Sequence, residues 1–205
     1  MSMTYYYNPM STAARTTWAI EELGVPCERV LVDFQKKETR TPEFLKLNPN
    51  GKVPLLVIDG TPIFESTAIL IHLAETYGVD KGLYAKPGLA RAEQLKWIAW
   101  ANIGLLMPLM RWMQNTSPMI PAEQHNAKAA EAAKTEADSM LKLLDDALDG
   151  KSYLTGGAFS MADLAAASYM GWLTFMKYDV SPFKNVRAWF GRCSERPAFQ
   201  RAMKG

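Results

Sequence analysis

The chain has 205 residues, 48% apolar and 21% charged, proportions of a globular protein that exclude a disordered chain. The chain has 23 Lys and Arg against 21 Asp and Glu, a net charge of +2, and no block of basic residues. It therefore lacks the basic surface by which proteins bind nucleic acid. No apolar run approaches the roughly 18–20 residues of a membrane span, and residues 1–7 lack a signal-peptide pattern. Two isolated cysteines and two histidines predict no metal site, and we expect a cytoplasmic protein.

The front of the chain begins with a predicted strand and helix. Residues 3–8 are aromatic and β-prone, and Pro9 ends that strand. A helix is predicted over 13–23, because Gly24 is a natural stop. A second strand is predicted around Val30 to Asp33.

The next predicted elements complete the order βαβαββα by residue 78. Thr41-Pro42 is typical of a helix start, with Thr as cap and Pro in the first turn. Asp59-Gly60 predicts a tight hairpin turn between strands at 53–58 and 61–64. Ser66 or Thr67 is expected to cap the helix that Gly78 ends.

The back of the chain predicts helices alone. Ser160 and Asp163 fit a capping box at the start of one of them. We therefore expect a strand-bearing domain at 1–80, a linker at 81–88 and an all-helical domain at 89–205. The helices are expected at about 89–115, 123–148, 161–177, 183–193 and 197–203.

Three turns of the front domain could carry chemistry. After the first strand, Ser11 or Thr12 stands at a helix start, where free N–H groups and the helix dipole suit an anion such as a thiolate. Either hydroxyl could equally be an ordinary cap. Val53-Pro54 requires an edge, a bulge or a cis bond, and a cis bond would leave the Val53 backbone to pair with a peptide-like ligand.

The third turn contains Glu65 and Ser66. A helix start can receive a carboxylate, and an adjacent acid can receive an ammonium, so this pair could bind the zwitterionic end of an amino acid. The alternative is a plain cap with an acidic neighbour.

In combination these turns resemble the soluble glutathione transferases. The resemblance covers essentially the whole chain, in particular the segments EELGVP at 21–26, NPNGKVP at 48–54, ESTAI at 65–69 and SMADLAAA at 160–167. It implies a thioredoxin-like glutathione-binding front and a helical back. It also implies glutathione as cosubstrate, with no metal, and a symmetric homodimer.

Within that family the sequence is similar to the serine-type theta and phi classes. The resemblance implies that the Ser11 hydroxyl hydrogen-bonds the glutathione sulfur, with Thr12 and Tyr7 as alternatives. The implied glutathione-binding residues are Arg40, Lys52, Val53, Pro54, Glu65 and Ser66. Because no Cys occurs before residue 27, thiol–disulfide chemistry by the protein is less expected.

The implied reaction depends on the thiolate of glutathione. Lowering a thiol pKa from about 8.5 by about two takes roughly 2.7 kcal/mol. One hydroxyl donor supplies about 1.5–3 kcal/mol and a helix terminus up to about 1 kcal/mol, so Ser11 would need no His partner.

A hydrophobic electrophile would then lie between the domains, where such pockets usually form. Its predicted walls are Met10, Trp100, Met107, Met110, Arg111 and Phe175. The main prediction is thus a transferase of alkyl or aryl groups. The alternatives are a non-catalytic binding or assembly module, and a glutathione-dependent peroxidase or dehalogenase on the same scaffold.

Overall fold

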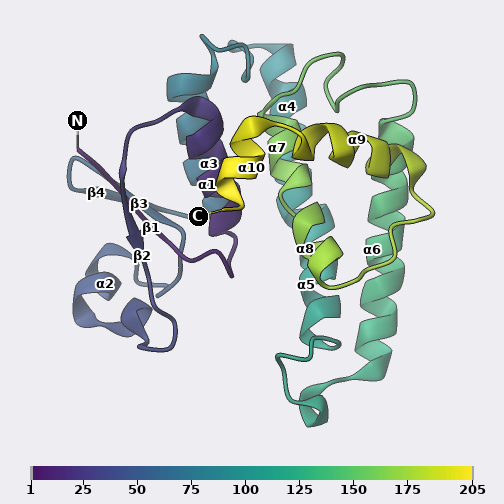
Figure 1. Ribbon diagram of the computed structural model, residues 1–205, viewed down its shortest axis with the longest axis horizontal. Coiled ribbons are helices and arrows are strands. Elements are labelled where there is room, and N and C mark those ends of the chain that lie inside the picture. Colours follow the sequence, from purple (N-terminus) through teal and green to yellow (C-terminus); the bar gives the residue numbers. More distant parts are fainter. Residues whose placement is uncertain (1, 205) are drawn as a thin grey trace. The chain divides into compact units, whose positions relative to one another are not determined.

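The computed structural model describes residues 2–204, which divide into two units (Figure 1). One unit runs up to Ala85 and also includes the residues from Glu195 onward, and the other is Lys86–Ser194. The all-helical domain expected at 89–205 therefore differs from the second unit mainly by the residues from Glu195 onward. No helix within residues 2–204 combines the length and hydropathy needed to cross a bilayer.

The first unit is built on a four-stranded sheet in the order β2-β1-β3-β4. β1 pairs in parallel with β2 and antiparallel with β3, and β3 pairs antiparallel with β4. The hairpin turn at Asp59-Gly60 has φ values of 46° and 82°, as a primed turn requires. The predicted βαβαββα order is confirmed. The strands are β1 (Met3–Tyr7), β2 (Glu28–Leu31), β3 (Leu55–Ile58) and β4 (Thr61–Phe64).

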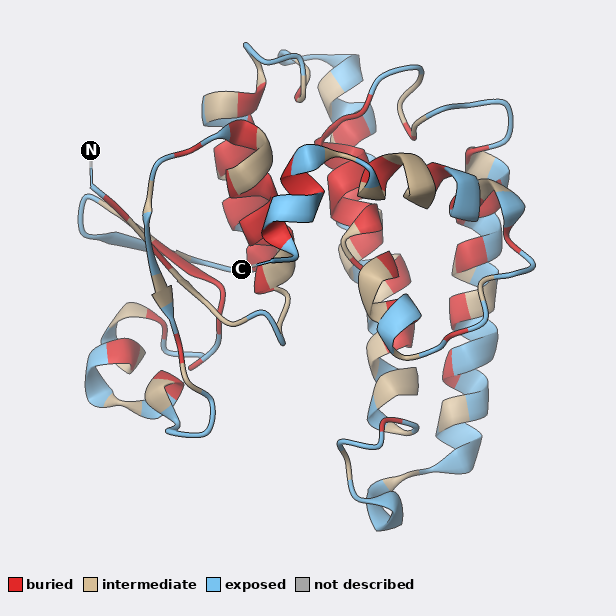
Figure 2. Cartoon of the chain, in the orientation of Figure 1, coloured by how far each residue is buried: buried red, intermediate tan, exposed pale blue. Residues whose placement is uncertain are grey.

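Helices cover both faces of this sheet. On one face α1 packs against α3, and most of α1 is buried (Figure 2). On the other face the α2 residue Phe44 meets Tyr6 edge-to-face at 6.0 Å and shares an apolar cluster with Val32, Val53 and Leu55. The helices are α1 (Ala13–Leu23), η1 (Glu38–Arg40), α2 (Pro42–Leu47), α3 (Ser66–Leu73), η2 (Ala74–Gly78) and α10 (Pro197–Ala202).

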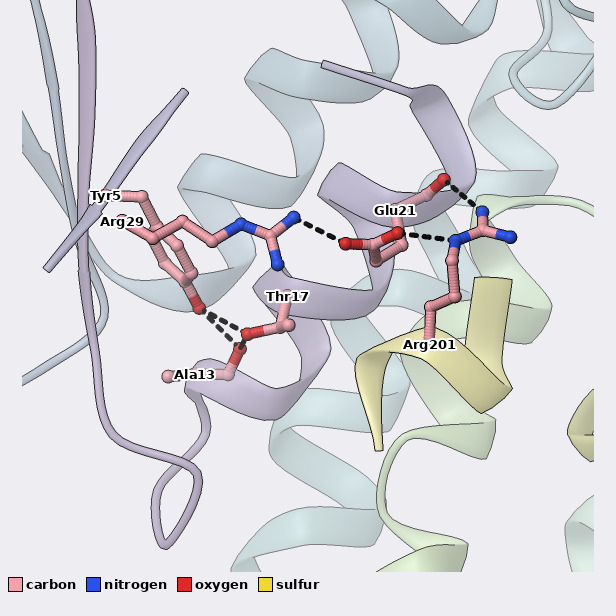
Figure 3. A network of polar contacts seen from close by, with 6 residues as sticks. All are labelled: Tyr5, Ala13, Thr17, Glu21, Arg29 and Arg201. Atoms are coloured by element: carbon pink, nitrogen blue, oxygen red, sulfur yellow. Dashed lines mark hydrogen bonds and ion pairs between the residues drawn. The ribbon is translucent and has the colours of Figure 1, made fainter. Parts of the chain in front are cut away.

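The last helix, α10, belongs to the first unit because it packs on α1. Phe199 meets the Trp18 ring edge-to-face at 4.9 Å. Arg201 Nε donates to Glu21 Oε2 at 2.7 Å, and Arg29 from β2 reaches the same carboxylate at 2.5 Å (Figure 3). These apolar and ionic contacts explain why residues 195–204 belong to the first unit.

The second unit contains helices only. A π-helical turn, η3, joins α4 to α5, so the helix predicted over 89–115 is nearly continuous. The helix predicted over 161–177 is divided, since α7 ends at Ala167 and α8 begins at Met170. The elements are α4 (Leu89–Trp100), η3 (Ala101–Leu105), α5 (Leu106–Gln114), η4 (Ala122–Gln124), α6 (Ala127–Ala147), α7 (Met161–Ala167), α8 (Met170–Phe175) and α9 (Lys184–Ser194).

A buried carboxylate organises the start of α7. Asp163 Oδ2 accepts from the Ser160 N–H at 2.9 Å, which confirms the predicted capping box. Its Oδ1 accepts from the Leu154 N–H at 2.8 Å and from Trp189 Nε1 at 2.9 Å. Burial raises the pKa of Asp163, and these hydrogen bonds oppose that rise. One side chain therefore joins a loop, α7 and α9.

Candidate functional site

The register of the sheet brings the three predicted turns of the first unit to one end. Tyr6 of β1 lies opposite Leu55 of β3, and Leu55 lies opposite Phe64 of β4. The segment that follows β1, the segment that precedes β3 and the segment that follows β4 must therefore leave the sheet at the same end. These segments hold Ser11, Val53-Pro54 and Glu65-Ser66 respectively.

The turn after β1 is held by its own hydrogen bonds. Asn8 Oδ1 accepts from the Met10 N–H at 2.9 Å, and the Asn8 carbonyl accepts from the Ser11 hydroxyl at 2.6 Å. Ser11 Oγ in turn accepts from the Ala13 N–H at 3.1 Å. Ser11 is half-buried and sits two residues before α1, where a polarised hydroxyl can face an anion.

The two alternative hydroxyls, those of Thr12 and Tyr7, have surroundings that differ from those of the Ser11 hydroxyl. Thr12 is the N-terminal boundary residue of α1, but its side chain makes no capping hydrogen bond. Tyr7 stacks on Tyr5 with ring centroids 5.3 Å apart, on the face of the sheet that α1 covers. The Ser11 hydroxyl, by contrast, both donates and accepts within the turn.

The segment before β3 contains the cis bond considered above, at Val53-Pro54. Val53 is buried, whereas Lys52 is exposed. Asn48 fixes this segment, because its Nδ2 donates to the Lys52 carbonyl at 2.7 Å and its Oδ1 accepts from the Asn50 N–H at 3.1 Å. Asn48 is not among the residues predicted for the site, although its Asn-Pro-Asn-Gly setting is a turn signal.

Arg40 lies against the same segment. Gly51 has φ of 59°, and a methyl group on it would lie 2.6 Å from Arg40 Nη1 and 3.0 Å from the Thr39 carbonyl oxygen. The guanidinium therefore rests over the Gly51 backbone beside Lys52. Both cationic side chains are exposed, so they can receive an anionic group at this end of the sheet.

The turn after β4 presents Glu65 at the start of α3. Glu65 is exposed and has φ of 71°, a conformation that favours glycine and is held here by α3 and β4. Ser66 is buried and is the first residue of the helix. The expected side-chain cap from Ser66 or Thr67 is absent, because the helix boundary falls one residue earlier, at Glu65.

A buried cation links the first turns of α1 and α3. Arg15 is 1% exposed, and its Nη1 donates to Thr67 Oγ1 at 3.0 Å. Burial lowers the pKa of Arg15 to about 9. This contact couples the turn that holds Ser11 to the turn that holds Ser66.

Candidate residues for an apolar substrate are divided between the units. Met10, 57% exposed, belongs to the first unit. In the helical unit, Met107, Met110 and Arg111 share one face of α5 by their spacing. Arg111 pairs with Glu136 of α6. Trp100, the last residue of α4, packs edge-to-face on Trp97 at 5.2 Å.

Phe175 lines a cavity of about 320 Å³ inside the helical unit. Its side chain is 69% exposed. Of the residues that the sequence predicted as pocket walls in this unit, Phe175 lines this cavity, and Trp100, Met107, Met110 and Arg111 do not. The other lining residues are Trp112, Thr116, Ser117, Pro118, Met119, Met176 and Lys177.

Thiols and metal ligands are sparse in the described structure. Cys27 is half-buried with a pKa raised by burial, Cys193 is buried, and neither is joined in a disulfide. Residues 2–204 hold no group of three or more His, Cys, Asp or Glu side chains placed to bind a metal ion.

Comparisons with known proteins agree with this architecture. Residues 1–75 match the family model of the glutathione S-transferase N-terminal domain, and residues 108–197 match that of the C-terminal domain. Glutathione S-transferase GstB of Escherichia coli (strain K12) is 31% identical over 205 residues, covering 96% of this chain and 94% of that protein. Disulfide-bond oxidoreductase YfcG of the same strain is 30% identical over 206 residues, covering 97% and 93%.

A solved structure shows the same fold. The crystal structure of a glutathione transferase family member from Pseudomonas fluorescens pf-5, with two glutathione bound, has a TM-score of 0.87 at 26% identity. The match covers 98% of this chain and 92% of that one. Both domain models and the full-length similarity to GstB therefore place this chain in the glutathione S-transferase family.

Proposed function

We propose that the chain is a glutathione transferase that binds glutathione at the end of the sheet where its three turns meet. The observation that carries this proposal is the strand register, which gathers a hydroxyl, a cis-proline segment and an acid–serine pair within one unit. The glutathione in the Pseudomonas fluorescens relative supports the same ligand here.

Each part of the tripeptide has a chemically suitable partner. Glu65 and the start of α3 at Ser66 receive the ammonium and carboxylate of the γ-glutamyl end. The Val53 backbone, before Pro54, pairs with the cysteinyl part. Arg40 and Lys52 receive the glycyl carboxylate, consistent with two exposed cations on one segment.

Ser11 acts as a hydrogen-bond donor to the sulfur. Its hydroxyl stabilises the thiolate relative to the thiol, and the N-terminus of α1 adds a favourable field. The thiol proton leaves to solvent, and the sulfur lone pair forms a C–S bond at the electrophilic carbon. The leaving group departs with the electron pair of the bond that breaks.

The electrophile is hydrophobic. Its candidate binding residues are Met10 in the first unit and, in the helical unit, Phe175 at the 320 Å³ cavity together with Trp100, Met107, Met110 and Arg111. The exposure of Met10, Met107 and Phe175, at 57%, 48% and 69%, supports this assignment, because large apolar side chains open to water suit an apolar ligand. The protein acts in the cytoplasm as a homodimer.

A conjugation assay with glutathione and a chloronitrobenzene tests the proposal. Ser11→Ala should lower turnover about a hundred- to a thousandfold, as loss of one oxyanion-type donor does, with a smaller change in glutathione affinity. Thr12→Ala and Tyr7→Phe should change turnover little. If either of these variants has the large effect instead, the sulfur donor is misassigned.

A second candidate is glutathione-dependent disulfide reduction, which the similarity to YfcG favours. Reduction of a small disulfide by glutathione, without conjugation of any electrophile, would establish it. Binding of glutathione without turnover would instead indicate a binding module. A substrate panel separates peroxidase and dehalogenase activity from both.

A further inference from the structure

We propose that Asn8 is a positioning residue that sets the Ser11 hydroxyl for thiolate formation. The proposal rests on the proposed function of Ser11 as the donor to the glutathione sulfur. Asn8 touches neither cosubstrate nor electrophile in this account. It acts through the turn that it holds, and three of its polar groups take part.

Asn8 determines where Ser11 Oγ lies. Its side-chain oxygen accepts from Met10 N–H at 2.9 Å and so closes the turn. Its main-chain oxygen accepts the Ser11 hydroxyl proton at 2.6 Å. A closed turn of this kind keeps the serine oxygen at one place relative to the end of β1.

Asn8 also ties this turn to the segment that follows β2. Asn8 Nδ2 donates to the Val32 carbonyl at 2.9 Å, and the Val32 N–H donates to the Tyr7 carbonyl at 2.8 Å. The Val32 side chain is 3% exposed and lies in the same apolar cluster as Val53. The Asn8 amide therefore connects the turn that holds Ser11 to the apolar cluster that contains Val53, the residue proposed to pair with the cysteinyl backbone.

The Ser11 hydroxyl has a single proton, which it donates to the Asn8 carbonyl. Donation to sulfur requires the proton to turn away from the Asn8 carbonyl, by rotation about the Cβ–Oγ bond. Ser11 Oγ need not move, because the Ala13 N–H still donates to it at 3.1 Å. The hydroxyl can therefore change its acceptor from the Asn8 carbonyl to the sulfur while Ser11 Oγ stays in place, provided that Asn8 keeps the turn closed.

The test uses two variants and one control. Asn8→Ala removes both side-chain hydrogen bonds. Asn8→Ser retains an acceptor for the Met10 N–H but is too short to reach Val32. The control is Asn126→Ala in the helical unit, where Asn126 Oδ1 accepts from the Ala129 N–H at 3.0 Å at the start of α6. The Asn126→Ala variant removes a comparable side-chain-to-backbone hydrogen bond, at a place remote in sequence from the turn that holds Ser11.

The decisive measurement is the pKa of protein-bound glutathione, from the ultraviolet absorbance of its thiolate against pH. Asn8→Ala should raise that pKa and lower kcat/KM about ten- to a hundredfold, the scale for slight misplacement of a reacting group. Asn8→Ser should fall between Asn8→Ala and the parent protein. Asn126→Ala should lower the unfolding temperature without moving the thiol pKa.

The outcomes separate the two proposals. A parent protein that binds glutathione with the ordinary thiol pKa would overturn the role of Ser11 itself. A parent protein that lowers the thiol pKa, with Asn8→Ala behaving like Asn126→Ala, would overturn the positioning role alone. If Asn8→Ala does not fold, Asn8→Ser decides, because an unchanged thiol pKa there contradicts the positioning role.

Discussion

The hydroxyl of Tyr5 on β1 donates a 2.7 Å hydrogen bond to the carbonyl oxygen of Ala13, the first residue of α1 (Figure 3). The N–H of the same Ala13 donates to Ser11 Oγ. Ala13 therefore links the sheet to the turn that holds Ser11, because its carbonyl oxygen accepts from Tyr5 and its N–H donates to Ser11. Thr17 Oγ1 lies 3.0 Å from the Tyr5 hydroxyl and completes the contact from within α1.

Tyr5→Phe tests this link between sheet and helix. The variant keeps the buried ring but loses the hydroxyl, so it should lower the free energy of unfolding by about 0.5–1.5 kcal/mol. Urea denaturation measures the loss. Tyr6→Phe is the matched control, since its ring packs on the opposite face against Phe44 and should cost little. Equal losses in the two variants would contradict the role of the Tyr5 hydroxyl.

Gly51→Ala tests the placement of Arg40. The new methyl group would lie 2.6 Å from Arg40 Nη1, at a residue with φ of 59°, so the guanidinium must move and the backbone is strained by about 1–2 kcal/mol. Calorimetry should show weaker glutathione binding. Gly60→Ala has the same kind of strain at φ of 82°, but no atom lies within 4 Å of its methyl group. It should lower stability without weakening glutathione binding.

Glu21→Gln tests the ionic contact between α1, β2 and α10. Burial alone would raise the pKa of Glu21, but hydrogen bonds from Arg201 and Arg29 outweigh it and hold the pKa below its ordinary 4.5. Between the folded-state pKa and pH 4.5, the unfolded chain therefore binds more protons than the folded chain. The stabilisation from Glu21 is present above pH 4.5 and is lost as pH falls through the folded-state pKa.

The stability difference between Glu21→Gln and the parent should therefore shrink as pH is lowered from about 6 to about 3. Denaturant unfolding across this range measures it. Glu131→Gln on the exposed face of α6 controls for the loss of one carboxylate. A difference that stays constant with pH would show that Glu21 contributes no linked protonation.

Asp163→Ala should be the most damaging single change in the helical unit. It leaves buried donors from Leu154, Ser160 and Trp189 without their acceptor, at about 1–3 kcal/mol each. We expect at least about 3 kcal/mol of destabilisation or failure to fold. Asp163→Asn keeps one acceptor oxygen and should be intermediate. A fully stable Asp163→Ala protein would contradict this account.

The bounds of α1 were predicted well because residues next to its ends determine where the helix begins and ends. Gly24 adopts φ of 60° and its N–H donates to the Ile20 carbonyl, so the helix ends where the sequence indicates. The start of β2 was placed too late. Glu28 and Arg29 are exposed residues of an edge strand and pair with Thr4 and Tyr5, and apolar patterning cannot detect such residues.

The geometry of the site was predictable at residues whose type allows few backbone conformations. Pro54 restricted its segment to a few geometries, and one of them, the cis bond, is present. Asn8 and Asn48 were not identified, because their partners Val32 and Lys52 are set by the folded turns around them. The placement of α10 likewise depends on Glu21 and Glu22, far away in sequence, and no local pattern encodes it.

The pairing of Arg196 with Glu22 joins residues 174 positions apart. During synthesis α1 leaves the ribosome long before α10, which covers Trp18, and before Arg196 and Arg201, which pair with Glu22 and Glu21. The apolar surface of the first unit around Trp18 therefore stays open until the residues from Glu195 onward have been made. Nascent chains that stall before residue 195 should expose Trp18, and chaperones should recognise them there.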